Sequence, residues 1–105
     1  MANIVLILTT WPDEHLARQA AAKWLELNLV ACVNILPEMT SIYRWDGEIQ
    51  TGSEHQMLLK TSAHRVDELM KSIVDLHPYE CPEILQLPVT GGYDEYIKWI
   101  KGNTE

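Results

Sequence analysis

Apolar and polar residues alternate along residues 29–61, and this period of two predicts a long two-stranded ribbon. The two arms meet at Trp45-Asp46-Gly47-Glu48. Asp-Gly between two apolar-rich runs is typical of a tight hairpin turn, because the turn needs a positive φ that glycine supplies. Each arm is longer than the average strand of about 5–6 residues. We therefore expect the far half of the ribbon to be solvated or buried by another subunit.

Both arms of the ribbon carry an interruption. Pro37 lies within the first arm, and proline lacks the N–H that a central strand must donate, so we expect an edge strand or a bulge there. Gly52-Ser53 marks a kink in the second arm.

The segments before the ribbon predict a strand and a helix. Residues 4–8 form a continuous apolar run that is typical of a strand buried on both faces. Residues 12–27 predict an amphipathic helix with Thr10 as its cap and Asn28 as a left-handed stop. The apolar stripe of this helix consists of Leu16, Ala17, Ala20, Ala21, Trp24 and Leu25.

The segments after the ribbon predict a helix, a strand and a short second helix. The first helix begins at Ser62 and ends before Pro78. Its predicted buried stripe is Val66, Leu69, Met70, Ile73 and Val74. Residues 83–89 predict a strand with Leu85, Leu87 and Val89 facing inward. Gly91-Gly92 then leads into a helix with Tyr93, Tyr96, Ile97 and Ile100 on one side.

The predicted element order is βαββαβ followed by an extra C-terminal helix. For this order an α+β ferredoxin-like split βαβ fold is the simplest arrangement. It places residues 4–8 and the second ribbon arm at the centre of the sheet. The edges are then the first arm and residues 83–89, and both of these segments contain or adjoin prolines. We expect residues 1–105 to form one domain, since no linker or repeat interrupts them.

The charge and the termini narrow the class of protein. A net charge of −7 argues against nucleic acid or an anionic membrane surface as the main partner. The N-terminus lacks the basic start and the long apolar core of a signal peptide, and no run approaches the roughly 20 apolar residues of a membrane span. Cys32 and Cys81 fit no disulfide or CxxC pattern, so we expect two reduced thiols in a cytoplasmic protein.

Signals for catalysis are weak. The chain has no serine in a nucleophile elbow and no glycine-rich phosphate loop. The phosphate loop of acylphosphatases, which share this fold class, would occupy the acidic stretch TTWPDE. RNA-binding domains of the same fold need aromatic residues on the central strands, which here are aliphatic. We therefore predict that the protein is not an enzyme.

The segment with most chemical potential is His77-Pro78-Tyr79-Glu80-Cys81. Imidazole and thiolate suit copper and zinc, which makes His77 and Cys81 the candidate metal ligands. Two ligands are fewer than the three or four of most zinc sites. The alternative interpretations are a helix-terminal histidine favoured by the helix dipole and a small buried cysteine.

The other polar candidates have simpler interpretations. His15, His55 and His64 are expected at the surface or in an interface. Glu54 and Lys60 share a strand face and predict a cross-strand charge pair. Trp45 lies at the hairpin tip, where an exposed aromatic residue indicates a protein interface.

Taken together, the blocks ACVNILP, SIYRWDGEI, MLLKT and HPYECPEILQLPV and the segment 96–99 resemble the CutA divalent-cation tolerance family over residues 4–100. The resemblance implies a ferredoxin-like fold and a cytoplasmic homotrimer in which the long hairpins pack around the threefold axis. It also implies a likeness to the PII signalling proteins, which bind small effectors in clefts between subunits. In this chain the corresponding cleft residues are Trp45, Lys60, His77, Tyr79 and Glu83.

The resemblance also implies a role in the response to metal ions. Copper-binding members are described with a cysteine at the end of the first strand and two histidines before the Pro-Tyr. This chain has Thr9 and Leu76 at two of these three positions and keeps only His77. Two hypotheses follow. Copper or another divalent metal binds at His77 and Cys81, or a small-molecule effector binds in the cleft between subunits.

Overall fold

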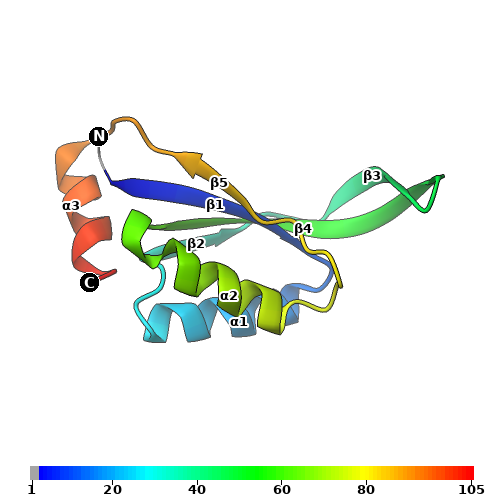
Figure 1. Ribbon diagram of the computed structural model, residues 1–105, viewed down its shortest axis with the longest axis horizontal. Helices are drawn as coiled ribbons and strands as arrows, with labels where there is room; N and C mark the ends of the chain where they lie inside the picture. Colours follow the sequence, from blue (N-terminus) through cyan, green and yellow to red (C-terminus); the bar gives the residue numbers. More distant parts are fainter. Residues whose placement is uncertain (1–2) are drawn as a thin grey trace.

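The computed structural model describes residues 3–105, so residues 1 and 2 of the predicted domain lie outside the described residues. The strands are β1 (Ile4–Trp11), β2 (Cys32–Ile35), β3 (Met39–Trp45), β4 (Glu48–Ser62) and β5 (Leu85–Pro88). The α-helices are α1 (Glu14–Glu26), α2 (Val66–Leu76) and α3 (Asp94–Gly102), and a 3-10 turn (Ala63–Arg65) precedes α2. In Figure 1 the β3–β4 hairpin projects from one end and α3 packs at the other.

The strands form an antiparallel sheet in the order β2-β4-β1-β5, and β3 pairs with the far half of β4. This is the ferredoxin-like arrangement with an extra C-terminal helix. It confirms that the first strand and the second ribbon arm are central, and that the other two positions are edges.

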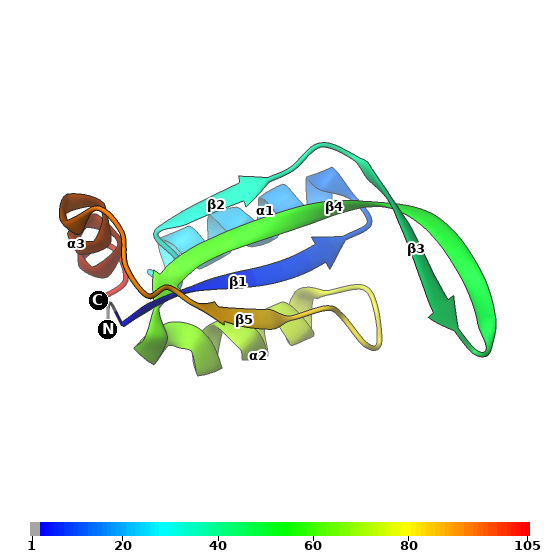
Figure 2. The ribbon, with the colours of Figure 1, turned by 90° about the horizontal axis from the view of Figure 1, so that it is seen from above.

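The ribbon differs between its two arms. The first arm is split into β2 and β3 around Pro37, whereas β4 runs for 15 residues without a break. Gly52 and Ser53 pair in register with Ser41 and Thr40, so the expected kink is not an interruption of pairing. Figure 2 shows β4 curving along its whole length into the hairpin. The turn has positive φ at Asp46 (51°) and Gly47 (77°), as its sequence predicted.

Helices α1 and α2 cover one face of the sheet, and the main core lies between these helices and the sheet (Figure 1). Ile7 of β1 and Leu59 of β4 are paired neighbours on this face and are almost fully buried. Trp24 of α1 packs edge-on against Trp11 at a centroid distance of 6.0 Å, and its Nε1 donates to Ser72 Oγ of α2 at 2.9 Å. The sheet and both helices thus meet at Trp24.

Two helix boundaries differ from the prediction, and one agrees with it. α2 begins at Val66, after the 3-10 turn, and not at Ser62, which is the last residue of β4. β1 extends to Trp11 because it stays paired with β4 as far as His55, so Thr10 belongs to a strand and is not a cap. Asp13 caps α1 instead, accepting hydrogen bonds from the N–H groups of His15 and Leu16. Asn28 has a φ of 57°, which confirms the left-handed stop.

Several side chains predicted to face inward are exposed. They are Leu16 and Leu25 of α1, Val74 of α2, and Leu85 and Leu87 of β5. The helices bury narrower stripes than their periodicity suggested. The prediction for β5 is wrong for another reason. Leu85 and Leu87 pair with Leu8 and Leu6, on the face of the sheet opposite to α1 and α2. α3 covers only the end of that face, where Ile100 packs on Ile4, and among the described residues no helix packs over Leu85 and Leu87.

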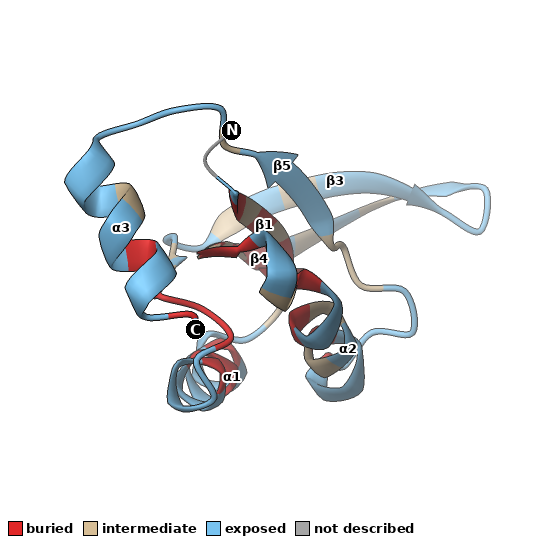
Figure 3. Cartoon of the chain, turned by 60° about the vertical axis from the view of Figure 1, so that its left-hand side comes forward, coloured by how far each residue is buried: buried red, intermediate tan, exposed pale blue. Residues whose placement is uncertain are grey.

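Figure 3 shows this division, with buried residues on β1, β4 and the inner sides of the helices, and with an exposed hairpin. The open face carries an apolar strip formed by Leu6, Leu8, Leu58, Leu85 and Leu87. α3 makes a smaller second core in which Ile100 packs with Ile4 and Ala31, and Val89 joins its edge as predicted. No helix within residues 3–105 has the length and hydrophobicity needed to cross a membrane.

Candidate binding cleft

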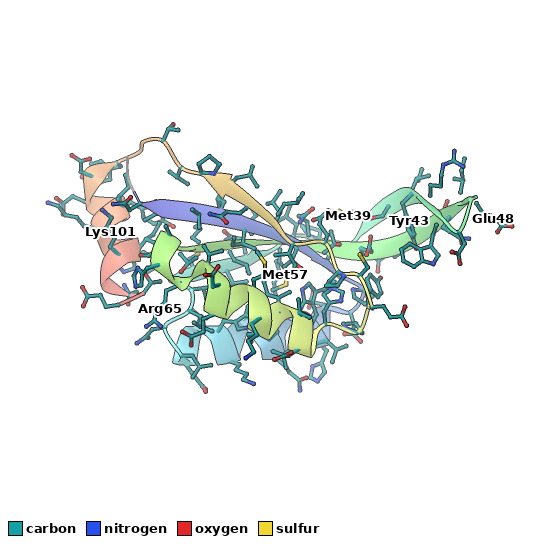
Figure 4. The ribbon with its side chains drawn as sticks, viewed as in Figure 1. Met39, Tyr43, Glu48, Met57, Arg65 and Lys101 are labelled. Atoms are coloured by element: carbon teal, nitrogen blue, oxygen red, sulfur yellow. The ribbon has the colours of Figure 1, made fainter. Side chains whose placement is uncertain are left out.

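A cleft of about 650 Å³ lies between the β3–β4 hairpin and the loop that follows α2. This volume is within the range of small-molecule sites, about 300–1,000 Å³. Its lining includes Met39, Tyr43, Trp45, Glu54, Tyr79 and Glu83. Figure 4 labels Met39 and Tyr43 on the hairpin beside this region.

The register of the hairpin brings its side of the cleft together. Met39 pairs with Glu54, and the pairing continues outward to Trp45 opposite Glu48. Because side chains alternate along a strand, Tyr43 and Trp45 lie on the same face as Glu54. The turn at residues 46–47 therefore sets which β3 side chains share a face with Glu54.

Tyr79 and Glu54 join the two walls of the cleft. The Tyr79 hydroxyl donates to Glu54 Oε2 at 3.1 Å, and Glu54 is only 9% exposed. Partial burial raises the pKa of Tyr79 to about 12, and the neighbouring Glu54 carboxylate adds to the rise because it disfavours a second negative charge. The phenol is therefore neutral at physiological pH and acts as a hydrogen-bond donor to the carboxylate.

His77 lies behind Tyr79 and holds it in place. The Nε2–H of His77 donates to the Thr10 carbonyl at 2.7 Å, and Nδ1 accepts from the backbone N–H of Tyr79 at 3.1 Å. A carbonyl only accepts and an amide only donates, so these bonds fix the neutral imidazole with its proton on Nε2. The ring is buried between Trp11 and Tyr79, at centroid distances of 4.5 and 4.8 Å.

Glu83 is tied to the sheet by Gln56. The Gln56 side-chain amide donates to Glu83 Oε2 at 3.2 Å and to the Thr9 carbonyl at 3.1 Å. The loop after α2 is therefore held to the sheet by His77 at Thr10 and by Glu83 at Gln56.

Lys60 does not line the cleft. Its Nζ lies 3.3 Å from the Tyr96 hydroxyl and 5.7 Å from the centre of that ring, at the α3 end of the molecule. The predicted Glu54–Lys60 charge pair is therefore wrong, since Glu54 contacts Tyr79 instead. Six residues along one strand separate the two groups by about 20 Å.

The candidate metal ligands His77 and Cys81 lie in different surroundings. Cys81 is exposed, which contradicts the interpretation as a buried cysteine. Both ring nitrogens of His77 are already hydrogen-bonded, so the imidazole offers no lone pair to a metal in this arrangement. Among residues 3–105, no three His, Cys, Asp or Glu side chains are grouped so as to hold a metal ion. The predicted ligand role of His77 and Cys81 stays a prediction.

The other histidines divide into two groups. His15 and His64 are exposed, as expected. His55 is buried, contrary to expectation, and its Nδ1–H donates to the Leu36 carbonyl at 2.9 Å. This bond holds β4 to the segment between β2 and β3.

Sequence reasoning assigned Glu54 to the wrong partner and overlooked Met39 and Tyr43. A usable signal existed for all three. Counting back from the Asp-Gly turn pairs Met39 with Glu54 and puts Tyr43 on their face. The contact with Tyr79 could not be found in this way, because it depends on how the loop after α2 folds back.

The chain is similar to proteins of one family. Residues 5–103 match the family model described as CutA1 divalent ion tolerance protein. The divalent-cation tolerance protein CutA of Thermus thermophilus is 45% identical over 104 residues, which cover 99% of each chain. The structure of the divalent cation tolerance protein from this organism has a TM-score of 0.94 and 43% identity, covering 97% of this chain and 99% of that one.

A more distant relative has the same fold. The structure described as the periplasmic divalent cation tolerance protein CutA from Archaeoglobus fulgidus is 31% identical, with a TM-score of 0.93. The match covers 97% of this chain and 99% of that one.

Proposed function

This chain belongs to the CutA1 divalent ion tolerance family, and from that membership we propose that it is a non-enzymatic, homotrimeric binding module. In this proposal the cleft between the hairpin and the loop after α2 receives a small-molecule effector. The protein acts in the cytoplasm, as part of the response to divalent metal ions that the family name describes.

The observation that carries the proposal is the built cleft. It has the volume of a small-molecule site, aromatic and apolar walls, and a polar pair, Glu54 and Tyr79, fixed by a hydrogen bond across it. Three of the five cleft residues expected from the family resemblance, Trp45, Tyr79 and Glu83, line this space.

The homotrimer is supported by the surface that one chain leaves uncovered. The open face of the sheet carries a strip of leucines, and at the hairpin Ile42 and Ile49 are about 70% exposed. Contiguous exposed apolar surface on a soluble chain marks an interface. A neighbouring copy would cover this surface and account for the extra length of the ribbon.

The hydrogen bonds of two polar groups, Tyr79 and His77, support the non-enzymatic part of this proposal. Tyr79 is neutral and donates a hydrogen bond to Glu54, so its oxygen is a poor nucleophile. His77 is not free to act as a base, because both of its nitrogens are engaged.

Direct binding of copper or another divalent metal by His77 and Cys81 is the second candidate. Cys81 is an exposed thiol at the rim of the cleft, beside Glu80, which favours transient contact with soft metal ions. Ligation by His77 would require the ring to give up its hydrogen bond to Thr10 or to Tyr79.

The free thiols of Cys32 and Cys81 support the cytoplasmic location in this proposal, because thiols stay reduced in that compartment.

Native mass spectrometry of the full chain tests the assembly and the metal. We expect a trimer. If the second candidate is correct, copper or zinc binds to the native chain and is lost in His77→Ala. A monomer at micromolar concentration would contradict the homotrimer.

A thermal-shift screen of metabolites in the presence of a chelator tests the effector. We expect a stabilising metabolite whose effect persists without metal and is reduced by Tyr43→Ala in the cleft. Tyr93→Ala, on an exposed tyrosine at the start of α3, is the matched control. If no metabolite acts, or if both variants respond alike, the cleft is not an effector site.

A further inference from the structure

The charges that face the cleft are all negative. Its lining contains three carboxylates, Glu54, Glu80 and Glu83, and no lysine or arginine. The whole chain has a net charge of −7, so the surrounding field also favours a positive ligand.

Glu54 is a buried carboxylate without a cationic partner in the described part of the chain. It is 9% exposed, and its hydrogen bond comes from a neutral phenol. The ion pairs within residues 3–105 are Arg18–Glu14, Arg65–Glu68 and Lys98–Glu95. A buried charge is costly unless an opposite charge accompanies it, so Glu54 indicates that a cation is missing from the single chain.

Aromatic rings complete the lining beside these carboxylates. Trp45, Tyr43 and Tyr79 are between 40% and 52% exposed, so their rings are accessible. Indole and phenol faces attract cations through the ring quadrupole, and the attraction is strongest for Trp. Carboxylates next to accessible aromatic rings suit an ammonium or guanidinium group attached to an apolar stem.

A bare metal ion fits this lining less well. The described residues contain no group of three His, Cys, Asp or Glu side chains that could surround an ion. The cleft is also much larger than a single ion, with room for a molecule of several carbon atoms.

We propose that the cleft binds a small organic cation, an amine or guanidine whose charged group faces Glu54 and whose stem lies against Trp45 and Tyr43. This inference rests on the proposed function, because it names the chemical class of the effector. In it Tyr79 is a positioning residue, since its hydroxyl orients the Glu54 carboxylate towards the cleft.

Three four-carbon probes test the charge preference on the full chain in its native assembly. They are the diamine putrescine, the neutral butanediol and the dianion succinate, compared by isothermal titration calorimetry. We expect heat of binding for the diamine alone. Equal or tighter binding of the diol or the diacid would overturn the proposal.

The Glu54→Gln variant tests how much the negative charge of Glu54 contributes to binding of the diamine. The glutamine oxygen can still accept the Tyr79 hydrogen bond, so the variant removes the charge and keeps the contact. We expect at least about a tenfold loss of diamine affinity, the size typical of a charge-assisted hydrogen bond. Glu26→Gln, on an exposed carboxylate of α1, is the control and should leave the affinity unchanged. Glu83→Gln provides a second cleft variant, with a smaller expected loss.

Failure of this inference can be told from failure of the proposed function. If neutral or anionic metabolites bind and Tyr43→Ala weakens them, the effector cleft stands and the cation is wrong. If neither the diamine nor any metabolite of the screen binds, both the organic cation and the effector cleft are wrong. If Glu54→Gln lowers the oligomer mass and the diamine does not bind, a basic side chain of a second copy neutralises Glu54, and the organic cation is excluded.

Discussion

The two halves of β4 have the same backbone pairing and opposite surroundings. In the near half, Met57 and Leu59 are fully buried under α1 and α2. In the far half, Ile49 is 69% exposed, although it pairs with β3 as regularly as Leu59 pairs with β1. The contrast shows that strand pairing alone does not bury side chains, because burial needs a second layer.

Among the described residues, α1 and α2 supply that second layer for the sheet β2-β4-β1-β5, and we call these elements the body. No such layer within residues 3–105 covers the β3–β4 hairpin. An isolated two-stranded hairpin is marginally stable in water. A neighbouring copy that provides the missing layer would therefore explain the length of the ribbon. Substitutions in the body and in the hairpin should have different effects.

The largest effect is expected in the body. Trp24→Ala removes a fully buried indole that contacts Trp11 and donates to Ser72. We expect the free energy of unfolding to fall by about 3–5 kcal/mol, measured by chemical denaturation at fixed protein concentration. Trp99→Ala, on a half-exposed indole of α3, should cost much less. Equal losses would contradict the view that the body holds the main core.

The hairpin should respond through assembly. Ile49→Asp places a charge on its exposed apolar face, and we expect size-exclusion chromatography with light scattering to show a mass below that of the native protein. The thermal midpoint should fall with it, because the oligomer and its stability are linked by mass action. Gln50→Asp puts the same charge on the other face of the same strand. An Ile49→Asp protein with the mass and stability of the native protein would show that the hairpin is not part of the interface.

The smallest effect concerns the contact between the two regions. Folding raises the pKa of Tyr79 from 10.0 to about 12, chiefly through burial and then through Glu54. The folded state therefore holds this proton more tightly than the unfolded chain does. The stability it contributes is complete below pH 10 and is lost as the pH rises towards 12.

Denaturation midpoints at pH 9 and above pH 11, compared between the native chain and Tyr79→Phe, measure this contribution. We expect the variant to lose less stability than the native chain over this interval. Identical pH dependence in the two proteins would show that Tyr79 titrates as it does in the unfolded chain.

The sequence was sufficient for the features set by local rules. Asp46-Gly47 fixed the turn, and prolines distinguished edge strands from central ones. Exposure was harder to predict. Leu85 and Leu87 were predicted to be buried because their composition is that of a core strand, and the sequence does not reveal that α3 covers only the other end of their face.

The candidate site was predicted in part for similar reasons. Trp45, Tyr79 and Glu83 do meet at the cleft, whereas Lys60 lies at the other end of the same strand. The pairing of Glu54 with Tyr79 joins residues far apart in sequence through the loop after α2, and no local pattern encodes that fold-back.

The unbroken course of β4 also has a consequence for how the chain folds. Its far half pairs with the adjacent β3 through a tight turn, which is the kind of hairpin that forms in about 1–10 μs. Its near half pairs with β1, from Ile4 opposite Ser62, and must wait for most of the first half of the chain to close into a loop. We expect amide protection during refolding to appear at Tyr43 before Ile7. The part of β4 that ends most exposed would then be the part that is ordered first.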